Sequence, residues 1–340
     1  MPSSLTSRFP QPTPASLVEA LVPPPRFSTV SLENYTPNPE YPSQAAALES
    51  VRRFADGLGR QGGSGVLGRL LRRSSAPRAG LYLDGGFGVG KTHLLTSLYR
   101  LAPGRALYGT FVEYTNLVGV LGYQQAVDEF RGAQLLCIDE FELDDVGDTL
   151  LMSRFIRELS DRGVAIAATS NTLPRALGEG RFAAQDFLRE ISAMADRFEV
   201  VRIDGDDYRH RDTFTEAPRF SADDVAFQAE RSGEGAVMDP FDDVLAHLVR
   251  VHPSRYGVLV EGIDHLYLTG VRQVSDHHQG LRLVVLIDRL YDRKVPLTFS
   301  GVGVGELFSP ELLASGYAKK YLRCLSRFGA LAADGARAAA

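Results

Sequence analysis

The most specific chemical pattern in this 340-residue sequence is Gly85-x-x-x-x-Gly90-Lys91-Thr92, a spacing typical of a phosphate-binding P-loop. Glycines carry no Cβ, so successive backbone N–H groups can close around phosphate oxygens. Lys91 would reach the β- and γ-phosphates of a nucleotide, and the Thr92 hydroxyl would ligate Mg²⁺. We therefore expect the whole loop to bind ATP, through Gly85, Gly86, Phe87, Gly88, Val89, Gly90, Lys91 and Thr92.

An acidic pair, Asp139-Glu140, follows the apolar run 135–138. If this run is a buried parallel strand, the pair lies at its carboxyl end, where ligands bind in open α/β sheets. Asp139 would hold Mg²⁺ together with Thr92, and Glu140 would polarise the water that attacks the γ-phosphate. The pair could also be two solvated acids at an ordinary strand end. The strand and helix between it and Thr92 favour the nucleotide site.

A third candidate is Asn171, which ends the apolar run that begins at Val164. A polar side chain at the end of a strand beside the acidic strand can bond the attacking water or the γ-phosphate, which is the sensor 1 role. Asn171 could instead start a turn before Pro174. Because both other motifs are present, we favour sensor 1.

Strands and helices alternate regularly around these residues. Further strands are expected at 105–109 and 199–203, and helices at 111–130, about 144–162 and 175–198. Five strands alternating with helices predict an α/β fold with a parallel, doubly wound sheet. The strand of Asn171 should lie between the P-loop strand and the acidic strand. That order is the ASCE plan of P-loop NTPases, and the sensor favours the AAA+ subclass.

Composition limits the partners and the cellular compartment that we expect for the protein. A net charge of −5 gives no overall bias toward polyanions, although the basic run from Arg69 to Arg78 could be a solvated surface or a local nucleic-acid patch. Two cysteines, Cys137 and Cys324, form no disulfide framework. No signal-peptide core and no apolar run of about 18 residues is found. We expect a soluble, cytoplasmic protein without a transmembrane segment.

Four segments are expected along the chain. Residues 1–34 are rich in proline and read as a flexible arm, and 35–205 as the P-loop AAA+ ATPase domain. Residues 206–331 read as a linker and a small α+β lid, and 332–340 as a disordered tail. In the lid we expect short strands at 256–260, 265–268 and 296–300, and helices at 276–293 and 310–331.

Five stretches together resemble the AAA+ ATPase family of bacterial cell division protein ZapE, with its mitochondrial AFG-type relatives: LYLDGGFGVGKTHLL, LLCIDEFELDDVGD, RGVAIAATSN, FEVVRIDGDDYRHR and LIDRLYDRKVPLTFSG. The resemblance runs from about Tyr35 to about Phe328. Its most specific parts are Asp139-Glu140-Phe141, Asp207-Tyr208-Arg209 and Arg323-x-x-Ser326-Arg327. The helix after the second strand is shorter than in the family and lacks its histidines.

The resemblance implies ATP and Mg²⁺ as cofactors and a homo-oligomer, a hexamer, in which an arginine finger acts in trans. Arg181 and Arg189 are the finger candidates, but altered spacing leaves both open, and either could be a surface charge. A sensor 2 arginine over the nucleotide would come from Arg323, Arg327 or Arg282, each of which could instead cap the core or lie on the surface.

Three functions are consistent with these residues. The first is an ATPase that remodels a protein partner, for which the division machinery is the candidate. No nucleic-acid partner is expected. The second is a replication initiator or helicase loader, because the string Gly90-Lys91-Thr92-His93-Leu94-Leu95 also occurs in initiators. The third is a nucleotide-binding scaffold without turnover, against which the intact Glu140 and Asn171 argue.

Overall fold

The computed structural model describes residues 2–59, 80–86, 88–141, 146–172, 193–205 and 217–338. The chain divides into two compact units. We call the first, formed by Pro14–Pro23 and Phe27–Tyr208, the P-loop unit. The second is the C-terminal unit, formed by Met1–Thr13, Pro24–Arg26 and Arg209–Ala340. The basic run 69–78 and most of the helix expected at 175–198 lie outside the described residues.

The P-loop unit contains a five-stranded parallel sheet in the order β2-β3-β4-β1-β5. Its strands are β1 (Gly80–Gly85), β2 (Ala106–Thr110), β3 (Leu135–Asp139), β4 (Ala165–Ser170) and β5 (Phe198–Ile203). The strand that ends before Asn171 therefore lies between the P-loop strand and the acidic strand. This order confirms the predicted parallel α/β sheet, and it brings the carboxyl ends of β1, β3 and β4 together.

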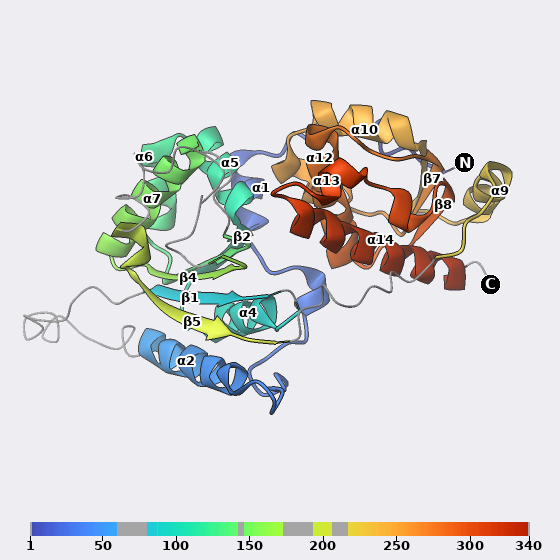
Figure 1. The fold of residues 1–340 in the computed structure, drawn as a ribbon. Helices are drawn as coiled ribbons and strands as arrows, with labels where there is room; N and C mark the ends of the chain where they lie inside the picture. Colours follow the sequence, from blue (N-terminus) through green and yellow to red (C-terminus); the bar gives the residue numbers. More distant parts are fainter. Residues whose placement is uncertain are drawn as a thin grey trace, which may run out of the picture. The chain divides into compact units, whose positions relative to one another are not determined.

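Helices cover both faces of this sheet (Figure 1). One face packs against α2 (Pro42–Gly59) and α4 (Lys91–Leu101), and the other against α5 (Phe111–Leu121), α6 (Tyr123–Phe130) and α7 (Val146–Asp161). The single helix predicted over 111–130 is two helices, because Gly122 breaks the chain with a φ of 79°. The side chains of Thr110 and Glu113 cap the start of α5.

The C-terminal unit is built on a second parallel sheet, in the order β6-β7-β8. Its strands are β6 (Ala236–Pro240), β7 (His265–Val271) and β8 (Leu297–Gly301). Its helices are α9 (Ala222–Arg231), α10 (Phe241–Arg250), α11 (Tyr256–Leu259), α12 (His277–Asp292), α13 (Pro310–Leu313) and α14 (Ala318–Ala338), with 3-10 turns at η5 (Pro253–Arg255) and η6 (Val304–Glu306).

Three expectations about this unit are wrong. The segment expected as a strand at 256–260 begins with the helix α11, Tyr256–Leu259, in which Tyr256 and Leu259 are buried at helical spacing. The helix expected at 310–331 is divided into α13 and α14. The tail after residue 331 continues α14 to Ala338, where Gly335 packs directly against the backbone of Leu297.

The N-terminal segment, expected as a flexible arm, is divided between the units: residues 2–13 belong to the C-terminal unit, and Pro14–Pro23 belongs to the P-loop unit. Ser3 forms a parallel bridge with Val237 beside β6, and Leu5 is fully buried in the C-terminal core. The short helices α1 (Pro14–Glu19) and η1 (Pro25–Phe27) follow, and Leu21 is buried in the P-loop unit. Apolar residues between the prolines, such as Leu5 and Leu21, fill core positions. No helix among the described residues is long and apolar enough to cross a membrane.

Candidate nucleotide-binding site

The P-loop connects the end of β1 to the start of α4. Gly90 precedes the helix with a φ of 89°, a left-handed conformation that favours glycine. A Cβ at Gly90 would also lie 2.5 Å from the Tyr35 ring, whose hydroxyl donates to the carbonyl of Val89 at 3.0 Å. The loop residue Phe87 lies outside the described residues. The N-terminal neighbour Tyr35 therefore helps to fix the loop, a contact that the sequence did not indicate.

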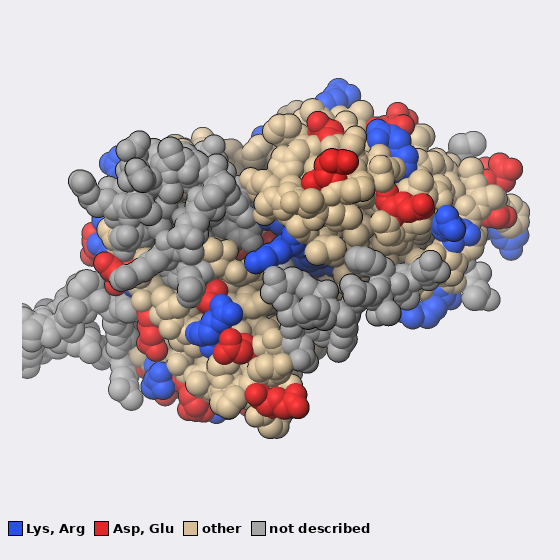
Figure 2. Space-filling model, in the orientation of Figure 1, with Lys and Arg blue, Asp and Glu red and all other residues tan. Residues whose placement is uncertain are grey.

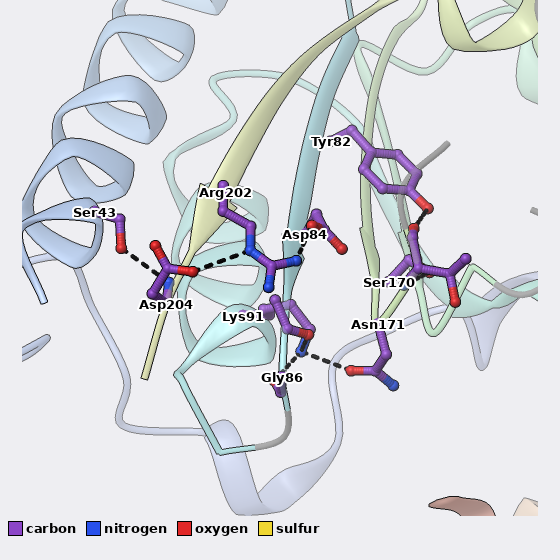
Figure 3. A network of polar contacts seen from close by, with 11 residues as sticks. Ser43, Tyr82, Asp84, Gly86, Lys91, Ser170, Asn171, Arg202 and Asp204 are labelled. Atoms are coloured by element: carbon purple, nitrogen blue, oxygen red, sulfur yellow. Dashed lines mark hydrogen bonds and ion pairs between the residues drawn. The ribbon is translucent and has the colours of Figure 1, made fainter. Parts of the chain in front are cut away.

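Lys91 points back into the loop and toward β4 (Figure 3). Its Nζ donates to the carbonyls of Gly85 at 2.7 Å and Gly86 at 2.5 Å, and to Oδ1 of Asn171 at 2.8 Å. Two of the predicted nucleotide-contacting side chains, Lys91 at the start of α4 and Asn171 directly after β4, are thus in direct contact. This geometry supports the role predicted for Asn171, because a γ-phosphate bound by Lys91 would lie beside its amide.

Asp139, at the end of β3, is only 7% exposed and accepts several hydrogen bonds. The hydroxyl of Thr92 donates to it at 3.2 Å and that of Tyr108 at 2.7 Å, and Thr169 donates to its Oδ1. Burial and the neighbouring Glu140 raise the pKa of Asp139, and the three hydroxyl donors partly oppose this. Burial and the Asp139 carboxylate raise the pKa of Tyr108 well above its usual range.

The pair of Thr92 and Asp139 fits a magnesium ion. Mg²⁺ prefers oxygen ligands and is commonly held by one or two carboxylates together with substrate phosphates and water. A hydroxyl and a carboxylate already in contact provide such oxygens. Among the described residues no group of three or more His, Cys, Asp or Glu could form an all-protein metal site. The two residues predicted to hold the metal therefore lie together, in a site that a nucleotide would complete.

Glu140 has a backbone conformation that is rare for a residue with a side chain. Its φ is 52°, and its N–H donates to Oγ1 of Thr169 at 3.1 Å and to Oδ1 of Asp139 at 3.2 Å. The next residue, Phe141, is fully buried and donates its N–H to the carbonyl of Thr169 at 2.7 Å. Left-handed backbone of this kind is often found at functional sites. Here it turns the chain away from β3 directly after the acidic pair.

An ion pair beside the P-loop, between a buried aspartate and an exposed arginine, was missed by the sequence analysis. Asp84 is fully buried at the end of β1, and Nη1 of Arg202 on β5 donates to it (Figure 3). Nε of Arg202 donates to Asp204 at 3.1 Å, and these bonds raise the pKa of Arg202. Ser43 accepts the N–H of Asp204 at 2.9 Å. Asp84 and Arg202 lie opposite each other in the β1–β5 pairing. The signal in the sequence was a charged residue near the end of each of these two strands.

The predicted arginines are not all placed. Arg181 and Arg189 lie outside the described residues. Arg323 and Arg327 lie on α14 and form ion pairs with Asp288 of α12 at 2.7 and 2.5 Å. Arg282 donates to the carbonyls of Leu248 and Val251 at 2.8 and 3.1 Å, the core-capping alternative considered for it. The arginine finger and sensor 2 assignments stay predictions.

Together, the strand order, the P-loop after β1, the acidic pair after β3 and Asn171 after β4 define an ASCE-type P-loop fold of the AAA+ class. The sequence profile of the AFG1-like ATPase family matches residues 13–233 and 223–338, which is nearly the whole chain. The chain belongs to the AFG1-like ATPase family, as the resemblance implied.

Two curated relatives illustrate the similarity. Cell division protein ZapE of Escherichia coli (strain K12) is 34% identical over 153 residues, which are 42% of this chain and 40% of that protein. Lactation elevated protein 1 homolog B of Danio rerio is 24% identical over 159 residues, 40% of this chain and 32% of that protein. The matched part is less than half the length of these relatives.

Solved structures with a related fold are more distant. A replication initiator DnaA bound to AMPPCP and single-stranded DNA has a TM-score of 0.39 and 20% identity, over 53% of this chain and 51% of that chain. A DnaC helicase loader has a TM-score of 0.37 and 18% identity, over 53% of this chain and 99% of that chain. Likeness at this level carries no conclusion about this chain.

Proposed function

We propose that this ATPase hydrolyses ATP with Mg²⁺ at the P-loop site and uses the energy to remodel a protein partner in cell division. The observation that carries the catalytic part is the convergence of side chains from different elements at one end of the sheet. Lys91 lies against Asn171, and Thr92 lies against Asp139. The name of the Escherichia coli relative, a cell division protein, supports the cellular part.

Each side chain has a distinct task in this proposal. Lys91 exchanges its loop carbonyl acceptors for the β- and γ-phosphates, and Asn171 orients the γ-phosphate or the attacking water. Thr92 and Asp139 hold Mg²⁺, which neutralises charge on the phosphate oxygens. Glu140 accepts a proton from, or polarises, the attacking water.

Two variants test the catalytic assignment. Lys91→Ala should abolish ATP binding, because the phosphates lose their principal cation. Glu140→Gln should keep ATP binding and lower turnover by about 10²–10⁴-fold, since only the general base is lost. Binding is measured with a fluorescent ATP analogue and turnover by phosphate release. Wild-type ATP affinity in Lys91→Ala would contradict the P-loop assignment.

The partner is tested with the same variants. Glu140→Gln with ATP should retain a protein partner that Lys91→Ala, the matched control, does not retain. In a bacterial host lacking this protein, we expect abnormal division that wild type rescues and Lys91→Ala does not. Normal division in that host would contradict the cellular role and leave the ATPase assignment intact.

Nucleic acid is the alternative partner. On the face in view of Figure 2, both units carry acidic as well as basic side chains among the described residues. The net charge is −5. A protein that neutralises several phosphates binds with steep salt dependence. We expect no more than about a twofold change in ATPase rate with added DNA or RNA at physiological salt. Strong stimulation by DNA would favour the initiator or loader class instead.

A further inference from the structure

A buried tyrosine on the edge strand β2 contacts the carboxylate predicted to hold the metal. Tyr108 is 3% exposed and pairs with Cys137 in the β2–β3 register, so its side chain shares a face of the sheet with Asp139. Its hydroxyl donates to Oδ2 of Asp139 at 2.7 Å. No motif in the sequence marks this residue.

The position of Tyr108 is well determined by its surroundings. Its ring packs edge-on against Tyr99 of α4, with ring centroids 6.1 Å apart. Its backbone N–H donates to the carbonyl of Leu21 at 2.9 Å, within the same unit. Apolar packing alone would be served by phenylalanine. A buried hydroxyl costs free energy unless it has a partner, and here a partner is the Asp139 carboxylate.

Donors restrain both oxygens of Asp139. Oδ2 accepts from Tyr108 at 2.7 Å, while Oδ1 accepts from Thr169 and from the N–H of Glu140 at 3.2 Å. Thr92 adds a weaker contact to each oxygen. With a donor on either side, the carboxylate cannot rotate freely. It can offer a metal one oxygen more readily than two.

We propose that Tyr108 is a positioning residue that sets the affinity and selectivity of this site for Mg²⁺. The inference rests on the metal role proposed for Asp139. Mg²⁺ demands a nearly ideal octahedron of single oxygens, whereas the larger Ca²⁺ accepts bidentate carboxylates and irregular geometry. A carboxylate held by Tyr108 and Thr169 presents one oxygen in a fixed direction and so favours the smaller ion. Hydrogen bonds to a metal ligand from its neighbours affect metal affinity in this way.

The test is Tyr108→Phe, which keeps the ring and removes only the hydroxyl. A non-hydrolysable ATP analogue is titrated by calorimetry at a series of Mg²⁺ or Ca²⁺ concentrations, so the readout does not depend on turnover. We expect the Mg²⁺ concentration that gives half of the maximal increase in analogue affinity to rise on the order of tenfold. The preference of the site for Mg²⁺ over Ca²⁺ should fall. Nucleotide affinity without divalent cation should be unchanged.

Tyr114→Phe is the matched control. Tyr114 is also fully buried, but its hydroxyl donates to the backbone carbonyl of Cys137 at 3.1 Å and not to Asp139. It should leave the Mg²⁺ dependence unchanged. Thr169→Val, which removes the donor on the other oxygen, should lower the preference for Mg²⁺ as Tyr108→Phe does, and it keeps the idea testable if Tyr108→Phe does not fold.

Several results would overturn the inference. If folded Tyr108→Phe has a Mg²⁺ midpoint within about twofold of the wild-type midpoint, the inference is wrong, because the expected rise is about tenfold. An equal shift in Tyr114→Phe, or a loss of nucleotide affinity without divalent cation, would also overturn it. Asp139→Asn separates this failure from that of the proposed function. If Asp139→Asn weakens Mg²⁺ dependence and Tyr108→Phe does not, only the role of Tyr108 is wrong.

Discussion

At the scale of single residues, the candidate site brings a lysine near a carboxylate that hydrogen bonds hold in place. Lys91 has loop carbonyls and Asn171 as acceptors, which a phosphate can replace. Asp139 is nearly buried and held by hydroxyl donors, and Glu140 has a φ of 52°. Preorganised groups lower the reorganisation needed during reaction. This arrangement is suited to positioning a metal and a water around a phosphate.

A single histidine should make the C-terminal unit sensitive to acid. Burial lowers the pKa of His265 from 6.5 to about 4. The ring stacks on Tyr267 with centroids 4.2 Å apart, and Nε2 lies 2.9 Å from Oγ1 of Thr298. Between pH 6.5 and about 4, His265 is protonated in the unfolded chain and neutral in the folded chain. The stability contributed by neutral His265 is therefore complete above pH 6.5 and lost as the pH falls toward 4.

His265→Gln measures this contribution, because glutamine can still bond Thr298 but does not titrate. Thermal unfolding midpoints of both proteins are compared between pH 7 and pH 4.5. We expect the wild-type midpoint to fall more steeply than that of the variant. Parallel pH curves would show that His265 does not govern the acid sensitivity.

At the scale of elements, the start of the N-terminal segment, residues 2–13, is an integral part of the C-terminal unit. The N–H of Ser3 donates to the carbonyl of Ala236 at 2.9 Å, and Met238 donates back to Ser3 at 2.9 Å. Asp239, 3% exposed, accepts from Ser4 at 2.6 Å and from the N–H of Leu5 at 2.7 Å. These bonds extend the edge of β6 and satisfy a buried carboxylate, which explains why this proline-rich segment is held in place.

Leu5→Ala tests the energetic weight of that segment. Leu5 is fully buried, so removing its side chain should destabilise the protein by about 2–5 kcal/mol. The free energy of unfolding is measured with denaturant, following the transition of the C-terminal unit. Val22→Ala is the control, because Val22 is 53% exposed and should change little. A Leu5→Ala protein as stable as this control would contradict the packing of residues 2–13.

At the scale of the whole molecule, assembly remains the main prediction. The AAA+ class suggests a homo-oligomer in which an arginine of one subunit neutralises the transition state in the next. Such arginines are worth about 10³–10⁵-fold in turnover. The described residues of the P-loop unit supply Lys91, Asp139, Glu140 and Asn171, and the candidates Arg181 and Arg189 belong to a stretch outside them.

Mixing variants tests this assembly. Arg181→Ala or Arg189→Ala alone should lose turnover, as should Lys91→Ala alone. A mixture of the correct arginine variant with Lys91→Ala should regain activity. Where the two kinds of subunit meet, the arginine variant supplies an intact P-loop and the Lys91→Ala subunit supplies an intact finger. Specific activity of wild type should also rise with protein concentration. Failure of both arginines to complement would exclude them as the finger.

The sequence by itself determined the local chemistry of this protein. Gly90, Lys91 and Thr92 could be assigned because a phosphate loop needs these residue types at fixed spacing within one turn. Strand order followed as well, since polar residues that end separate apolar runs must meet at one edge of a parallel sheet. Helix and strand boundaries were less accurate, and the break at Gly122 and the helix at 256–259 were not foreseen.

Tertiary structure alone decided the contacts between residues far apart in the chain. Tyr108 meets Asp139, and Asp84 meets Arg202, only because β2 pairs with β3 and β1 with β5 in one particular register. A shift of one residue would turn each side chain to the other face of the sheet. The burial of Leu5 likewise depends on an edge of β6 formed more than 200 residues later. Such pairings are set by packing of the whole core, which no local pattern encodes.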